Sequence, residues 1–302
     1  MEQYKIIFAG LANAGKSSLI LTLKRQFSAL PSIKPTKGIE RTEMDILGFK
    51  IVTWDLGGQD IYRSEYKKKQ AIIFSDTELF YFLIDATADS DTCDDALKYF
   101  QEIIEIYRLA DPKHMPCFIV CLHKLDPNLP IEYSEQIEDL TEKIENLLEG
   151  LDFKIFETSI YNLQSIIEAF SWGISKFLPK QSELDLIMKQ FLSEYSTISI
   201  ANLLEKQSMY LVHAFRDEKS HEYFNQLKDG IISIIENMGD QLHLLTFIIN
   251  NETKLYIERL TILQRDYYFI IMGTDLDFDA IQKSLIDTYY ARIQKVVLAE
   301  AK

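Results

Sequence analysis

The feature that most constrains this chain is the segment GLANAGKS at residues 10–17, which has the glycine, lysine and serine spacing of a phosphate-binding loop. An apolar run at residues 5–9 precedes it and predicts a strand, and a helical pattern follows it. Glycines let the backbone curl until successive N–H groups point at phosphate oxygens, and the start of the helix adds positive charge. Lys16 should reach the β- and γ-phosphates, and the Ser17 hydroxyl should bind Mg²⁺. The residues expected around the phosphates are Ala12, Asn13, Ala14, Gly15, Lys16, Ser17 and Ser18.

A second segment, WDLGGQ at residues 54–59, supplies groups for chemistry at these phosphates. It closes a predicted strand with Asp55, whose carboxylate suits a water-mediated contact with Mg²⁺. Gly58 should present its backbone N–H to a γ-phosphate, and Gln59 is the candidate for orienting an attacking water. Together the two segments favour nucleoside triphosphate hydrolysis.

The segment HKLD at residues 123–126 predicts which base is bound, because it follows an apolar run at residues 117–122. A carboxylate such as Asp126 accepts two hydrogen bonds from guanine, whereas adenine offers no matched pair of donors. The stem of Lys124 should lie along the base, and backbone N–H groups at residues 158–160 should cap it. The residues expected at the base are His123, Lys124, Asp126, Ser159 and Ile160.

Short apolar runs alternate with helical patterns along the first two-thirds of the chain, which predicts an α/β fold with helices on both faces of a mostly parallel sheet. Gly48 should form the hairpin of the one antiparallel pair. A helix at residues 163–177 should end before Pro179, which places a GTPase-type domain at 1–180 and a second domain at 181–302. The six predicted strands cover residues 5–9, 43–47, 49–54, 79–85, 117–122 and 154–157.

The second domain has a different order of elements. Two short connections, at residues 250–252 and 264–266, leave no room for parallel crossovers, so the strands they join should form an antiparallel meander. The domain is therefore predicted to be α+β. The expected helices cover residues 183–192, 198–204, 219–238 and 279–297, and the expected strands cover 209–215, 242–249, 254–263 and 267–273.

Composition excludes several classes of protein. Acidic residues outnumber basic ones by 46 to 32, and the net charge of −14 repels nucleic acid and anionic lipid. Three cysteines are too few for a disulfide framework and favour the cytoplasm, and Cys117 and Cys121 flank a run that predicts core packing rather than a metal pair. No signal peptide, lipidation motif or long apolar stretch is present, so we expect no direct membrane anchor and recruitment to a membrane only by a partner.

These motifs resemble the Ras superfamily, and most closely the Rag/Gtr family, whose members carry a roadblock-type domain behind the GTPase domain. Three features favour that family: His123 where asparagine is usual, Thr-Ser-Ile at residues 158–160 where Ser-Ala-Lys is usual, and the α+β segment at 181–302. The phosphate loop and residues 54–59 are also similar to Arf-like proteins. Arf proteins end after the GTPase fold, however, and no amphipathic helix precedes the first strand here.

The resemblance implies roles for two further residues. Thr36, in KPTKG at residues 34–38, should contact Mg²⁺ and the γ-phosphate, which makes Ser17, Thr36 and Asp55 the metal set. His123 should bridge the base pocket and the phosphate loop through a ring N–H; the alternative is a surface-loop histidine. The catalytic residues are then Gln59, Lys16 and Thr36.

The resulting hypothesis is a GTP-binding switch that hydrolyses GTP to GDP. No internal arginine finger is obvious, although Arg25, Arg41 and Arg63 lie near the motifs in sequence, so turnover should be slow without an activating protein. The resemblance implies activating and exchange proteins, and a homo- or heterodimer formed through the C-terminal domain. One alternative is a GTP-binding interaction scaffold with negligible turnover, and another makes the C-terminal half an assembly platform.

Overall fold

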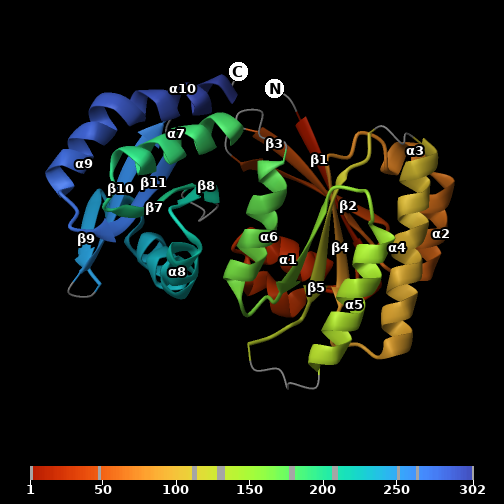
Figure 1. Cartoon of the computed structure of the whole chain (residues 1–302). Helices are drawn as coiled ribbons and strands as arrows, with labels where there is room; N and C mark the ends of the chain where they lie inside the picture. Colours follow the sequence, from red (N-terminus) through yellow and green to blue (C-terminus); the bar gives the residue numbers. More distant parts are fainter. Residues whose placement is uncertain are drawn as a thin grey trace. The chain divides into compact units, whose positions relative to one another are not determined.

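The computed structural model describes residues 3–46, 49–110, 114–127, 133–176, 181–205, 210–249, 252–262 and 265–300 (Figure 1). The chain forms two compact units, Met1–Gly173 and Ile174–Lys302. The boundary expected after residue 180 falls at residues 177–180, outside the described residues, so the division into domains 1–180 and 181–302 stays a prediction.

The first unit is built on a six-stranded sheet in the order β2-β3-β1-β4-β5-β6. Neighbouring strands are parallel except β2 and β3, which are antiparallel. The six predicted strands and the antiparallel pair are confirmed, while Leu47 and the turn at Gly48 lie outside the described residues. The strands are β1 (Gln3–Gly10), β2 (Ile39–Ile46), β3 (Phe49–Leu56), β4 (Leu79–Asp85), β5 (Cys117–His123) and β6 (Phe153–Thr158).

Helices cover both faces of this sheet, as the sequence predicts. Figure 1 shows α1 and α6 on one face and α2, α3 and α4 on the other. No helix in the described residues is long and apolar enough to cross a bilayer. The helices are α1 (Lys16–Leu23), α2 (Asp60–Lys68), α3 (Gln70–Ile73), α4 (Ser90–Ala110), α5 (Ser134–Leu147) and α6 (Leu163–Ser175).

Aromatic side chains fill the core on the α4 face of the sheet. Phe82 stacks on Phe100 with ring centroids 4.3 Å apart, and Tyr107 meets Phe80 edge-on at 5.7 Å. Strands β4 and β5 are apolar along their length because both of their faces are covered. Cys117 and Cys121 are buried in β5 as free thiols, which confirms their core placement.

The second unit contains a five-stranded antiparallel sheet in the order β8-β7-β11-β10-β9. The meander of β9, β10 and β11 is confirmed. Its strands are β7 (Ile198–Glu205), β8 (Tyr210–Phe215), β9 (Leu244–Ile248), β10 (Thr253–Ile262) and β11 (Arg265–Thr274). The helices are α7 (Gln181–Glu194), α8 (Glu218–Met238), α9 (Phe278–Ser284) and α10 (Tyr290–Glu300), with a π-helical turn at Leu285–Tyr289 between the last two.

One prediction in this unit was wrong: residues 198–204 form strand β7, not a helical segment. The strand lies between β8 and β11, and nearly every one of its side chains is buried. A strand buried on both faces loses the alternation of polar and apolar residues that would identify it, and a short apolar run then resembles a helix. The sheet therefore has five strands rather than the four predicted.

Candidate functional site

The phosphate loop joins the end of β1 to the start of α1, as predicted. Gly10 and Gly15 have φ angles of 146° and 93°, and Asn13 has a φ of 64°, so the backbone curls sharply between strand and helix. A Cβ atom at Gly10 would overlap the carbonyl oxygen of Leu83. Glycine is thus required at this position both by conformation and by space.

Lys16 lies buried at the centre of this loop, only 6% exposed. Its Nζ donates to the carbonyl oxygens of Gly10 at 3.1 Å and Leu11 at 2.8 Å. Burial lowers the pKa of this ammonium to about 8, although the charge of Asp55 opposes the shift. Lys16 therefore remains mostly charged at neutral pH, in surroundings that would favour a bound anion.

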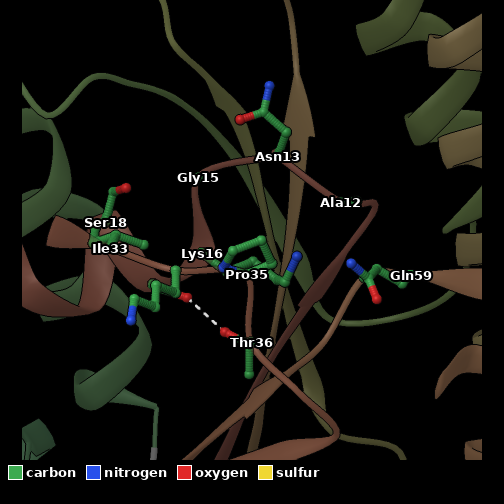
Figure 2. A pocket seen from close by; sticks show the side chains of 12 residues that line it. Ala12, Asn13, Gly15, Lys16, Ser18, Ile33, Pro35, Thr36 and Gln59 are labelled. Carbon is green, nitrogen blue, oxygen red and sulfur yellow. Dashed lines mark hydrogen bonds between the residues drawn. The ribbon is translucent and has the colours of Figure 1, made fainter. Parts of the chain in front are cut away.

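Three oxygen-bearing side chains meet beside Lys16. Ser17 Oγ donates to Asp55 Oδ2 at 2.5 Å, and Thr36 Oγ1 donates to the same oxygen at 3.0 Å. The Ser17 and Thr36 hydroxyl oxygens also lie 2.9 Å apart, the contact dashed in Figure 2, where either hydroxyl could donate in place of its bond to Asp55. The predicted metal set thus comes together from α1, β3 and the segment 34–38.

Asp55 has the chemistry that a magnesium site needs. Its Oδ1 atom is buried and has no hydrogen-bond partner within the described part of the chain. Burial raises the pKa of Asp55, and the hydrogen bonds from Ser17 and Thr36 together with the charge of Lys16 oppose that shift. Hard divalent cations prefer carboxylate and hydroxyl oxygens, so this set fits Mg²⁺.

A cavity of about 290 Å³ opens above these groups, lined by residues 12–13, 15–18, 33–36 and 58–59. Figure 2 shows Gln59 beside Ala12 at its edge, with Thr36 and Pro35 below the phosphate loop. Gly58 lies so close to the loop that a Cβ atom would overlap the backbone of Leu11 and Ala12. The predicted phosphate contacts therefore gather around one cavity, with the exception of Ala14.

Ala14 is buried, and its N–H donates to Leu11 O at 3.3 Å rather than pointing into the cavity. No arginine lies among the described residues that line this cavity. Arg41 stacks on Trp54 at 3.7 Å and Arg63 lies over Tyr99 at 4.9 Å. That the chain has no internal arginine finger stays a prediction.

The residues expected at the base form a second cluster at the ends of β4, β5 and β6. Asp126 Oδ1 accepts a hydrogen bond from Ser159 Oγ at 2.5 Å. Lys124, in a left-handed conformation with a φ of 69°, places its Nζ 2.6 Å from Asp85 Oδ2. Ser159 is fully buried and Ile160 is partly exposed beside it. Each carboxylate oxygen can accept more than one hydrogen bond, so Asp126 keeps acceptors on both oxygens for a ligand.

His123 joins the two clusters. It is 2% exposed, so its interpretation as a surface-loop histidine is wrong. Its Nδ1 lies 2.9 Å from Thr158 Oγ1, and that hydroxyl in turn donates to Leu122 O at 3.5 Å. Because the Thr158 hydroxyl hydrogen is used in that bond, Thr158 Oγ1 accepts the hydrogen bond from His123 Nδ1. The ring hydrogen of the neutral imidazole is therefore assigned to Nδ1. The other edge of the ring faces Gly15, where an added Cβ atom would lie 2.7 Å from Nε2. His123 thus bridges to the phosphate loop by packing, and its N–H points to Thr158.

Sequence reasoning missed Asp85. Its Oδ1 accepts from Thr87 N at 3.2 Å and from Thr87 Oγ1 at 2.8 Å, while Oδ2 binds Lys124. A polar residue at the carboxyl end of a parallel strand was the available signal. The motifs did not indicate Asp85, because its partner Lys124 comes close only through the pairing of β4 with β5.

This arrangement defines the P-loop small GTPase fold: a six-stranded, mostly parallel sheet whose first strand leads through a phosphate loop into a helix. The sequence model of the Gtr1/RagA G protein conserved region matches residues 5–263 of this chain. The chain belongs to the Gtr1/RagA family, which confirms the resemblance found from the motifs.

The chain is also similar to several individual proteins. The GTP-binding protein GTR1 of Saccharomyces cerevisiae is 25% identical over 292 residues, which cover 93% of this chain and 89% of that protein. The small COPII coat GTPase SAR1 of Giardia intestinalis is 25% identical over 183 residues, covering 57% of this chain and 88% of the relative. The solved Arl6 BBS3 small GTPase of Trypanosoma brucei, with bound nucleotide analogue GppNp, has 20% identity and a TM-score of 0.46 and covers 58% of this chain and 96% of its own.

Burial of neutral His123 predicts a specific pH dependence of stability. Burial lowers the pKa of this imidazole to about 4, from an ordinary value of about 6.5. Between these values the unfolded chain binds more protons than the folded one, so His123 should reduce the free energy of unfolding by about 1.4 kcal/mol for each pH unit below 6.5. Denaturant titrations of the wild type and of His123→Asn between pH 7 and 5 measure the difference in slope. Identical slopes would contradict a buried, neutral His123.

Proposed function

We propose that this chain is a GTP-binding switch that hydrolyses GTP to GDP. The observation that carries the proposal is the buried Lys16 ammonium beside the oxygen cluster of Ser17, Thr36 and Asp55. A buried cation and a buried carboxylate at one cavity are the complements of a phosphate chain and its metal ion.

The phosphates would be held by the curled loop. Its positive-φ residues curl the backbone beside the cavity, and the start of α1 would add the positive end of the helix dipole. Lys16 would leave its carbonyl partners and neutralise the β- and γ-phosphates. The residues proposed around the phosphates are Ala12, Asn13, Gly15, Lys16, Ser17, Ser18 and Gly58; Ala14, whose N–H donates to Leu11 O, is left out of this set.

Guanine would be selected at the second cluster. Asp126 is fixed by Ser159, so its carboxylate is oriented before any base arrives. Asp85 holds the Lys124 ammonium, which leaves the aliphatic stem of that lysine to cover one face of the base. His123, Ser159 and Ile160 complete the proposed pocket.

Magnesium would be held by Ser17 and Thr36 directly and by Asp55 through water. When bound, Mg²⁺ would offset the negative charge of the β- and γ-phosphate oxygens. The free Oδ1 atom of Asp55 supports this assignment, because a buried carboxylate oxygen without a partner is costly.

Hydrolysis would be an in-line attack of water on the γ-phosphate. Gln59 lies exposed at the start of α2, at the edge of the cavity, where its amide could orient that water. Lys16 would stabilise charge in the transition state, and Thr36 would hold the metal. With no arginine among the described lining residues, turnover would be slow until an activating protein supplies one, worth about 10³ to 10⁵ in rate.

The second unit is proposed to be a roadblock-type module that pairs with a copy of itself or with a related GTPase. Strand β9 lies at the edge of the sheet, and Leu244, Phe247 and Ile248 on it are 44%, 39% and 73% exposed. An exposed apolar edge strand favours pairing with another chain. Exchange and activating proteins would act on the first unit, in the cytoplasm or at a membrane to which a partner recruits the chain.

The base assignment predicts a change of specificity in Asp126→Asn. An amide keeps one acceptor for N1–H but turns a donor toward the exocyclic amine of guanine, whereas xanthine has an oxygen there. The variant should bind GDP about 100-fold more weakly and xanthosine diphosphate more tightly than GDP. Competition against a fluorescent nucleotide measures both, with the wild type as the control. Retention of the wild-type preference would refute the role of Asp126.

The hydrolytic role of Gln59 separates the switch from a nucleotide-binding scaffold. Gln59→Leu should slow single-turnover GTP hydrolysis about ten- to a hundredfold, because the attacking water loses its orienting group, while GTP affinity stays unchanged. Phosphate release from preloaded protein measures the rate. If the wild type and Gln59→Leu release phosphate at the same rate, and that rate equals the rate in buffer alone, the scaffold alternative is favoured.

A further inference from the structure

The two segments that border the phosphate cavity also contact each other outside it. Gly57 N donates to Gly38 O at 2.8 Å. A Cβ atom on Gly57 would lie 2.6 Å from Thr36 O and 3.1 Å from Gly38 O, so only glycine allows this approach. The backbone that carries Thr36 is therefore packed directly against the backbone that leads to Gln59.

The hydroxyl of Tyr66 binds the same carbonyl. Tyr66 Oη donates to Gly38 O at 2.6 Å and lies 3.3 Å from Gly57 O. The side chain projects from α2 into the core and is 4% exposed. Burial raises the pKa of this phenol far above its usual range, so it stays a hydrogen-bond donor at any ordinary pH.

This contact bears on Thr36, two residues before Gly38. Thr36 is 8% exposed, whereas its neighbours Pro35 and Lys37 are exposed. Its hydroxyl reaches Asp55 only while the segment lies inward against the sheet. Fixing the Gly38 carbonyl from two directions, by Gly57 and by Tyr66, limits how far that segment can move outward.

We propose that Tyr66 is a positioning residue whose hydroxyl, by holding Gly38, keeps Thr36 at the metal position when the γ-phosphate is present. The proposal rests on the proposed GTP switch. Because Tyr66 and Gln59 both belong to the segment that forms α2, the same bond links the positions of the metal-binding threonine and the water-orienting glutamine. Loss of the γ-phosphate would release Thr36 and leave Tyr66 without its Gly38 acceptor.

The competing interpretation is that the Tyr66 hydroxyl only satisfies buried carbonyls in the core. In that case its removal would destabilise the two nucleotide-bound states equally. The positioning role instead requires a difference between them, because it expects the bond to Gly38 to be kept in the triphosphate-bound state and lost in the diphosphate-bound state.

Tyr66→Phe tests this difference, because it removes one oxygen and preserves the ring. Tyr81→Phe is the matched control: Tyr81 is a buried tyrosine of β4 whose hydroxyl donates to the backbone carbonyl of Ala169 at 3.2 Å and lies 3.4 Å from that of Phe170. Dissociation rates of fluorescent GDP and of a fluorescent non-hydrolysable GTP analogue are measured on the full-length wild type and both variants, with Mg²⁺ present. Thermal melts of the GDP-bound proteins check that both variants fold.

Loss of one hydrogen bond should make the GTP analogue leave Tyr66→Phe about three- to tenfold faster, with the GDP rate changed less than about twofold. Tyr81→Phe, which also removes a hydrogen bond to a backbone carbonyl, should alter neither rate selectively. Equal acceleration of both nucleotides in Tyr66→Phe, or no acceleration of either, would overturn the positioning role while leaving the GTP switch intact. A wild-type chain that binds neither nucleotide would refute the switch itself, and this inference with it.

Discussion

A buried ammonium and a buried carboxylate, Lys16 and Asp55, set the requirements for the rest of the first unit. Burial lowers the pKa of Lys16 and raises that of Asp55, so each is disfavoured in its charged form, and each partly stabilises the other. Charges held away from water need close partners of opposite sign. The hydroxyls of Ser17 and Thr36 and the carbonyls of the phosphate loop supply polar contacts, but a phosphate chain and a metal ion would satisfy these groups more fully.

The parallel sheet gives these groups their positions. Strands β1, β3, β4, β5 and β6 end at the same edge, because each pairs in parallel with its neighbour. That edge carries the phosphate loop, the metal set, the carboxylate of Asp85 and the base cluster. The ring of His123 packs between Thr158 and Gly15, so it sets the spacing between the end of β6 and the loop before α1. The Tyr66 contact with Gly38 ties α2 to the segment that carries Thr36.

Much of this arrangement could be predicted from the sequence, because the motifs carry their own geometry. The phosphate loop needs glycines at Gly10 and Gly15, and the apolar runs before and after the motifs specify strands. Strand β7 was misassigned because burial on both faces removes the period that distinguishes a strand. The contacts of Asp85 with Lys124 and of Tyr66 with Gly38 join residues 39 and 28 positions apart in the chain, so they depend on strand pairing and helix placement that no local pattern encodes.

The central proposal is that the phosphate cavity and the cluster around Asp126 together hold a guanine nucleotide with Mg²⁺. Calorimetric titration of the nucleotide-stripped chain with GDP and with ADP, each with Mg²⁺ and with a chelator, tests it most directly. The account predicts that GDP binds at least about 100-fold more tightly than ADP and that the chelator weakens GDP binding. Equal affinity for both nucleotides, or no binding of GDP, would contradict it.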